Sequence, residues 1–69
     1  MKMSARNILK GKVVRIVKGA VNDEVTIQLS GGETIVAIIT DGSVENLRLK
    51  EGKDAYAIIK ASSVMIGID

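Results

Sequence analysis

Hydrogen-bond donors gather in three short stretches of the sequence, and each stretch also contains small residues. The stretches are SARN at 4–7, TDGS at 40–43 and KASS at 60–63. Hydroxyl, ammonium and guanidinium groups beside accessible backbone N–H groups have the chemistry that binds an oxyanion. The donor side chains are those of Ser4, Arg6, Thr40, Ser43, Lys60, Ser62 and Ser63.

Catalysis is a poor match to this composition. The chain contains no His and no Cys, so it has neither an imidazole base nor a thiolate nucleophile. A Ser nucleophile would need Lys as its base, which is an uncommon arrangement. The same absences leave only carboxylates as metal ligands. We therefore expect no enzyme activity, no metal coordinated directly as a cation, and no cofactor.

Each donor also has an ordinary structural explanation. Arg6 and Lys60 could be solvated surface charges. Ser43 could cap a helix, and Ser62 and Ser63 could be turn residues. For any one of these residues taken singly, the structural explanation is the better one.

The size and composition of the chain indicate an oligomer. With 69 residues it forms at most one domain, spanning 1–69, and so small a domain buries too little surface to be robustly stable alone. Disulfides are excluded because Cys is absent, and a zinc site is disfavoured for the reason given above. Since 46% of the residues are hydrophobic and only Tyr56 is aromatic, we expect much of the apolar surface to pack against other copies.

Short β-rich segments separated by Gly and Asp predict an all-β fold. A first strand starts at Asn7 and contains Gly11, where we expect a bulge or a sharp bend. Apolar residues alternate with polar ones over 24–29, which predicts a strand with one buried face. Gly31 and Gly32 then predict a hairpin turn into a third strand.

The remaining segments predict one helix and two further strands. Ser43 is a good N-cap for a short helix, with Glu45 in its first turn. The last strands are expected over 54–60 and 64–68. Five strands, with one helix between the third and the fourth, match the small OB-like Greek-key barrel. The third and fourth strands are apolar on both faces, so we expect their outer faces to lie in subunit interfaces.

An OB-type barrel often binds single-stranded nucleic acid by stacking bases on aromatic side chains. Phe and Trp are absent, and Tyr56 lies in an apolar strand. The ten basic residues are interleaved with eight acidic ones, and the net charge is only +2. This charge balance suits a small anion better than a nucleic acid.

The sequence resembles the molbindins, the free-standing Mop domains that bind molybdate and tungstate in the bacterial cytoplasm. The resemblance covers essentially the whole chain and depends most on the SARN…KG opening and the IKASSVM ending. It implies a hexamer, a trimer of dimers, with oxyanions bound between subunits. Arg15 and Arg48 depart from the family pattern, in which small residues are frequent at these positions.

The resemblance also assigns the binding residues. In the family, the Ser and Arg of SARN contact the oxyanion, TDGS contributes hydroxyl or backbone donors, and the Lys and small residues of the last turn complete the site. Ala61 has no hydroxyl group and could offer only its N–H. The site implied here consists of Ser4, Ala5, Arg6, Thr40, Ser43, Lys60, Ala61 and Ser62.

The resulting hypothesis is a cytoplasmic protein that binds molybdate or tungstate for storage or homeostasis. Lysines and arginines interrupt every apolar run near the N-terminus, so we expect neither a signal peptide nor membrane association. Two alternatives stay open at this point. One is an OB-type nucleic-acid-binding module, and the other is a purely structural assembly domain.

Overall fold

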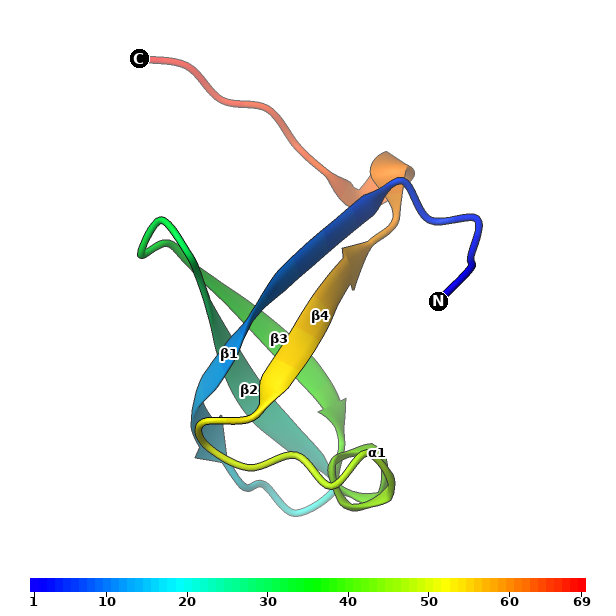
Figure 1. Ribbon diagram of the computed structural model, residues 1–69, viewed down its shortest axis with the longest axis vertical. Helices are drawn as coiled ribbons and strands as arrows, with labels where there is room; N and C mark the ends of the chain where they lie inside the picture. Colours follow the sequence, from blue (N-terminus) through cyan, green and yellow to red (C-terminus); the bar gives the residue numbers. More distant parts are fainter.

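The computed structural model describes residues 1–69 and consists mainly of β-strands (Figure 1). Four strands, one short α-helix and one 3₁₀ turn are present, so the five strands expected from the sequence are not all formed. None of the helices is long and apolar enough to cross a membrane. The elements are β1 (Asn7–Val17), β2 (Asn22–Leu29), β3 (Thr34–Thr40), α1 (Asp41–Asn46), β4 (Asp54–Ile59) and η1 (Ala61–Ser63).

The four strands form one antiparallel sheet in the order β3-β2-β1-β4. The first half of β1 pairs with β4, from Asn7 opposite Ile59 to Lys12 opposite Asp54. The second half of β1 pairs with β2. Because β1 changes partner along its length, the sheet curls and β4 comes to lie across the face of β3 (Figure 1). The strands β3 and β4 are the two edges of this curled sheet.

The expected irregularity in β1 lies at a different residue from the one predicted. Gly11 is paired regularly, and the register shift falls between Val13 and Arg15. Gly11 is needed for close approach instead, since an added Cβ would lie 2.5 Å from the carbonyl oxygen of Gln28. A side chain at this position would therefore collide with β2.

The core is small and lies inside the curled sheet. The buried hydrophobic residues are Val13, Val25, Ile27, Val44 and Ala57. The period-two prediction for β2 is confirmed, because Val25 and Ile27 are buried whereas Glu24 and Gln28 are exposed.

The outer faces of the edge strands carry apolar side chains that nothing covers in the single chain. Val36 and Ile38 of β3 are 56% and 63% exposed, and Tyr56 and Ile58 of β4 are 50% and 47% exposed. Together with the core residues, these side chains make β3 and β4 apolar on both faces, as the sequence indicated.

The helix α1 starts one turn earlier than the sequence suggested. Its N-cap is Thr40, whose Oγ1 accepts a hydrogen bond from the backbone N–H of Ser43 at 3.0 Å. Ser43 is thus inside the helix and is not its cap, and the acidic residue of the first turn is Asp41 rather than Glu45. The sequence TDGS offers two hydroxyl residues three positions apart, and the cap is the one that follows directly from β3.

The end of α1 gives Arg48 a defined conformation. The N–H of Leu49 donates to the carbonyl of Val44 at 3.0 Å, and that of Arg48 donates to Glu45 at 3.0 Å. These two bonds form a Schellman motif, which requires a left-handed residue directly after the helix. Arg48 has a φ of 53° and is the only residue other than Gly with a positive φ.

The segment after η1 forms no strand, contrary to the expectation for residues 64–68. In Figure 1 it extends away from the sheet. Met65, Ile66 and Ile68 are 92%, 93% and 95% exposed. A strand needs a neighbouring strand to pair with, and in the single chain this segment lies against none.

Candidate functional site

The pairing of β1 with β4 brings the two ends of the chain together. Asn7 lies opposite Ile59 in the ladder, and its side-chain amide donates to the Ile59 carbonyl at 3.2 Å. Arg6 directly precedes this pair on one strand, and Lys60 directly follows it on the other. The SARN and KASS stretches are therefore neighbours in space.

A shallow hollow of about 600 Å³ lies between these two stretches. It contains six of the eight residues predicted for the site. One further residue, Ile58 of β4, was not predicted. The lining consists of Ser4, Ala5, Arg6, Ile58, Lys60, Ala61 and Ser62.

The 3₁₀ turn η1 provides backbone donors at the hollow. The N–H of Ser63 donates to the Lys60 carbonyl at 2.9 Å, and that of Val64 donates to the Ala61 carbonyl at 3.3 Å. The first N–H groups of such a turn, those of Ala61 and Ser62, have no carbonyl partner inside it. Ala61 can thus contribute its N–H although it lacks a hydroxyl group.

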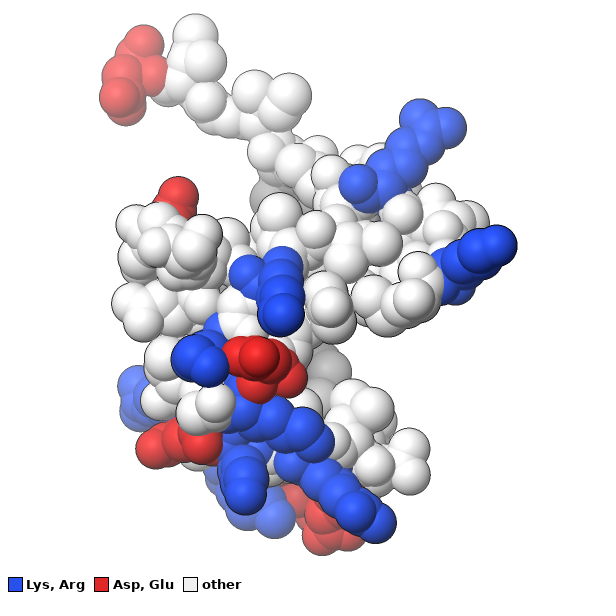
Figure 2. Space-filling model, viewed as in Figure 1, with Lys and Arg blue, Asp and Glu red and all other residues white.

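The two cations of the hollow have no acidic partner. The ion pairs of the chain are Lys12 with Asp54 and Lys18 with Asp41, each at 2.9 Å, and neither includes Arg6 or Lys60. Figure 2 shows acidic and basic side chains intermixed over the lower part of the molecule. The basic side chains at its upper right, near the N-terminus and η1, have no acidic neighbour in this view.

The two ion pairs lie outside the hollow, and each lowers the pKa of its carboxylate. A hydrogen bond from Lys12 and its charge lower the pKa of Asp54. A hydrogen bond from Lys18 lowers the pKa of Asp41, and the same contact raises the pKa of Lys18. Neither Asp41 nor Asp54 lines the hollow, which contains no carboxylate at all.

The two remaining predicted residues, Thr40 and Ser43, lie away from the hollow. They belong to the start of α1, at the opposite end of the sheet from η1 (Figure 1). The Thr40 hydroxyl donates to Ser43 Oγ at 2.8 Å while it accepts from the Ser43 N–H. The hydroxyl hydrogen of Thr40 is thus already used, whereas that of Ser43 donates to no protein group.

Comparison with known proteins connects this arrangement to a family. Residues 3–66 match the TOBE domain. The chain belongs to the TOBE domain family. It is 52% identical to the "Probable molybdenum-pterin-binding protein" of Haemophilus influenzae over 69 residues, which is the full length of both chains.

Solved structures of related proteins share the fold of this TOBE domain. MopII from Clostridium pasteurianum superimposes with a TM-score of 0.92 at 48% identity, covering 97% of this chain and all of MopII. The cytoplasmic molybdate-binding protein ModG, solved with molybdate bound, superimposes with a TM-score of 0.96 at 49% identity. That match covers the whole of this chain and 49% of ModG. The resemblance to Mop domains found in the sequence is confirmed.

The polar side chains that line the hollow of this TOBE domain can donate hydrogen bonds to a ligand, and none of them is a carboxylate. Hydroxyl groups, N–H groups, a guanidinium and an ammonium can all donate to the oxygens of an anion. No group of three or more His, Cys, Asp or Glu side chains is placed to hold a metal ion. Ile58, which the sequence analysis missed, is an exposed apolar residue on β4 and contributes a wall without a donor. Ile58 lies two residues after Tyr56, on the same face of β4, and this spacing could have indicated its position from the sequence.

Proposed function

We propose that this TOBE domain binds the oxyanions molybdate or tungstate in the hollow between the SARN and KASS stretches. The observation that carries this proposal is the composition of the hollow. Donors from the two ends of the chain meet there, Arg6 and Lys60 lack acidic partners, and no carboxylate is present.

The names of the relatives support this ligand. The Haemophilus influenzae relative is named for molybdenum-pterin binding, and ModG is described as a cytoplasmic molybdate-binding protein. A role in binding rather than in catalysis agrees with these names and with the absence of His and Cys. We place the protein in the cytoplasm, where it stores the oxyanion or maintains its level.

The donor set favours a dianion without a proton. Molybdate and tungstate only accept hydrogen bonds near neutral pH, whereas phosphate, with a second pKa of about 6, carries a proton part of the time. A bound phosphate would need an acceptor for that proton, and the hollow offers no carboxylate. Leaving such a donor unpaired costs about 1–3 kcal/mol, so phosphate should bind more weakly.

The binding site is proposed to lie at a subunit interface of a hexamer built as a trimer of dimers. One reason is the uncovered apolar surface on the outer faces of β3 and β4. A second reason is that Thr40 and Ser43 cannot join the hollow of their own chain from the far end of the sheet. A neighbouring copy could bring its α1 start to the hollow, with the free Ser43 hydroxyl as the donor.

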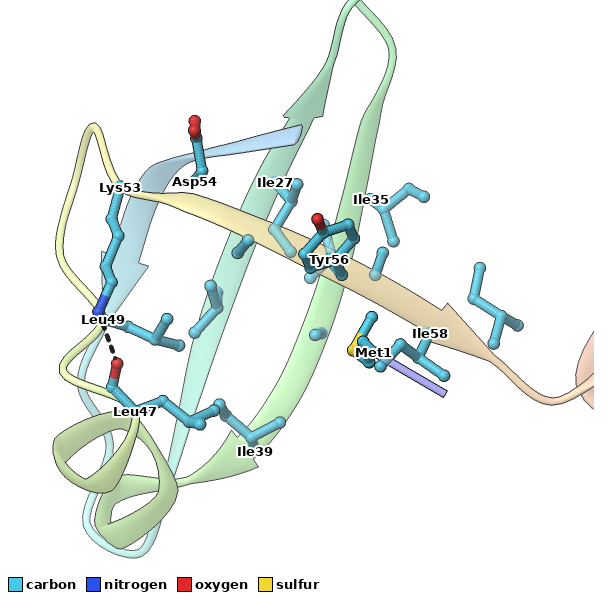
Figure 3. A pocket seen from close by; sticks show the side chains of 16 residues that line it. Met1, Ile27, Ile35, Ile39, Leu47, Leu49, Lys53, Asp54, Tyr56 and Ile58 are labelled. Carbon is cyan, nitrogen blue, oxygen red and sulfur yellow. Dashed lines mark hydrogen bonds between the residues drawn. The ribbon is translucent and has the colours of Figure 1, made fainter. Parts of the chain in front are cut away.

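Nucleic-acid binding is not favoured. Tyr56 is the single aromatic residue, is 50% exposed, and lines an apolar pocket together with residues of β3 and β4 (Figure 3). One such ring cannot form a stacking platform for successive bases.

A melting experiment with a charge-neutral variant tests the proposed function. A ligand that binds only the folded state stabilises it by about 2.7 kcal/mol per site when its free concentration is a hundredfold above Kd. Saturating molybdate should therefore raise the Tm of the wild type. In Lys60→Met, which keeps most of the apolar stem, most of this increase should disappear while stability without ligand is equal or higher.

The matched control is Lys50→Met, because Lys50 is also exposed but lies outside the hollow. This variant should retain the full molybdate-induced increase in Tm. Equimolar sulfate provides the ligand control. If Lys60→Met responds to molybdate as strongly as the wild type does, the anion is held elsewhere and the proposed site is wrong.

A further inference from the structure

Asp23 is the one polar residue among the fully buried side chains of the chain, with 0% of its surface exposed. It lies near the start of β2, next to the turn of residues 18–21 that follows β1. Its Oδ1 accepts a hydrogen bond from the backbone N–H of Gly19 at 3.1 Å, whereas its Oδ2 is buried without a donor. Burying an ionised carboxylate in this way is costly, because no group replaces the water that the unpaired oxygen has lost.

A second carboxyl group lies against Asp23. The side chain of Asp41, the first residue of α1, forms a side-chain hydrogen bond with that of Asp23. The backbone supports this contact, since the N–H of Asp41 donates to the carbonyl of Val21 at 2.9 Å, in the same turn as Gly19 (Figure 1). Two carboxyl groups can form a hydrogen bond with each other only when one of them carries a proton.

The charges around this carboxyl pair, Asp23 and Asp41, indicate which member holds the proton. Lys18 Nζ lies 2.9 Å from Asp41 Oδ1. The hydrogen bond from Lys18, followed by that with Asp23, lowers the pKa of Asp41, so Asp41 is the ionised member. Glu45 of α1 adds a negative charge near Lys18, and β3 places the apolar Ile39 opposite Asp23. One ammonium group cannot neutralise three carboxylates, so the buried one is the best place for a proton.

We propose that Asp23 keeps a proton at neutral pH and donates it to the Asp41 carboxylate, so that this proton attaches the start of α1 to the turn between β1 and β2. The bond gives the buried oxygen of Asp23 a role. A hydrogen bond of the O–H···O⁻ kind is charge-assisted and stronger than one between neutral groups. When Asp23 ionises at higher pH, two adjacent negative charges repel each other and the attachment is lost. The carboxyl pair is therefore a pH-sensitive switch in the fold.

The switch lies beside a donor of the proposed binding site. Ser43 follows Asp41 by two residues in α1, and its hydroxyl is proposed to reach the hollow of a neighbouring copy. Loosening the start of α1 would move this donor, so molybdate affinity should fall once Asp23 ionises. This consequence rests on the proposed function, whereas the shared proton does not. The tests below are made without molybdate, so failure of the proposed function would leave their results unchanged.

The composition of the chain makes this proton measurable. His and Cys are absent, so no other side chain has an ordinary pKa between about 5 and 7. In the unfolded chain Asp23 ionises around the ordinary aspartate pKa of 3.8. The folded state then binds one proton more than the unfolded chain, and this stability is lost as the pH rises. The folding equilibrium constant should fall about tenfold per pH unit over this range.

The first test compares denaturant unfolding at pH 5 and pH 7 at one protein concentration. The folding equilibrium constant of the wild type should fall about a hundredfold between these two pH values. Asp23→Asn keeps the shape of the side chain and donates from an amide that does not titrate, so its stability should stay constant. Asp54→Asn is the matched control, because it removes the carboxylate of an exposed ion pair, and it should keep the wild-type dependence. Equal pH dependence in Asp23→Asn and the wild type would overturn the proposal.

The second test reads the proton directly in the wild type and needs no variant to fold. At pH 7, with a chelator present, carboxyl ¹³C NMR should show Asp23 with the chemical shift of a protonated carboxyl group and Asp41 with that of a carboxylate. An ionised Asp23 at this pH would overturn the proposal. A bound cation is the alternative to the proton, and it is tested by adding Ca²⁺ instead of the chelator. An unchanged Asp23 resonance supports the shared proton, whereas a Ca²⁺-induced change to the ionised form would contradict it.

Discussion

The side-chain amide of Asn7 donates a hydrogen bond to the carbonyl oxygen of Ile59 at 3.2 Å, at the point where β1 begins and β4 ends. This bond ties the stretch containing Arg6 to the stretch containing Lys60. The two cations of the proposed site are positioned by one antiparallel pair of strands.

Removing this tie should weaken both folding and binding. Asn7→Ala should lower the free energy of unfolding by about 0.5–1.5 kcal/mol, the usual net contribution of one hydrogen bond. It should also lower molybdate affinity, because Arg6 and Lys60 are held less firmly. Asn7→Asp, which keeps the size of the side chain but cannot donate, should weaken molybdate binding further, because it also adds a negative charge next to Arg6 and Lys60. Full molybdate affinity in Asn7→Ala would show that the tie does not position the site.

Substitutions of Thr40 and Ser43 should have different effects, because Thr40 caps α1 whereas the Ser43 hydroxyl is proposed to bind the ligand. Thr40→Ala removes the N-cap of α1 and should cost about 0.5–2 kcal/mol of stability in urea unfolding. Thr34→Ala, an exposed threonine at the start of β3, should cost less.

Ser43→Ala keeps the N–H that donates to Thr40 and removes only the hydroxyl group. It should leave the helix intact but weaken molybdate binding, by about 1.5–3 kcal/mol if the hydroxyl donates to the charged ligand. Unchanged affinity in Ser43→Ala would show that no second copy brings this hydroxyl to the hollow.

Substitution by Ala at two glycines should change the stability of the fold in opposite directions. Gly11→Ala should destabilise the fold by about 1–3 kcal/mol, because the added Cβ would lie 2.5 Å from Gln28 O and 2.6 Å from Ile27 Cγ2. Gly42→Ala should stabilise α1 by about 0.5–1 kcal/mol, since nothing lies within 4 Å of its added Cβ. Thermal unfolding of both variants measures the difference, and equal effects would contradict the close approach of β1 and β2.

The ion pair between Lys18 and Asp41 should give stability a defined pH dependence. Its hydrogen bond lowers the pKa of Asp41 below the ordinary value of 3.8, so the folded state binds this proton less readily than the unfolded chain does. The resulting stability is present above the ordinary pKa and is lost as the pH falls through the folded-state pKa. In Lys18→Met, the decrease in stability from pH 5 to pH 2 should be smaller than in the wild type.

Lys10→Met controls for the loss of one positive charge, because Lys10 has no ion pair. Added salt should also reduce the effect, since both partners are accessible to solvent. If the acid branch of the stability curve is the same in Lys18→Met and the wild type, the pair does not contribute.

Much of the fold could be predicted from local patterns. Alternation over 24–29 identified β2, and Gly31 with Gly32 identified the turn between β2 and β3. The position of the irregularity in β1 could not be predicted in the same way. A Gly in a strand can mark a bulge or a close approach, and only the curled sheet shows that Gly11 is the second kind.

Residues 64–68 show a second limit of prediction from local patterns. A strand was expected over residues 64–68, but the apolar pattern of a segment does not specify a partner strand. In the single chain no partner is present, so the expected fifth strand is absent.

The sequence predicted correctly the part of the candidate site that the pairing of β1 with β4 brings together. It did not predict where the other residues lie. The residues around Arg6 and Lys60 meet because β1 pairs with β4. Thr40 and Ser43 share the same donor chemistry, yet they cap a helix at the other end of the sheet. Residue type alone could not distinguish these two placements.

Calorimetric titration with molybdate is the most direct test of oxyanion binding in the hollow. The wild type should bind molybdate saturably and bind phosphate more weakly. Arg6→Ala should lose about 1.5–3 kcal/mol of binding free energy, the usual range for a hydrogen bond to a charged group, with little change in stability without ligand. Arg15→Ala, an exposed arginine outside the hollow, should bind as the wild type does. Equal molybdate affinity in Arg6→Ala and the wild type, or no saturable binding at all, would contradict the account.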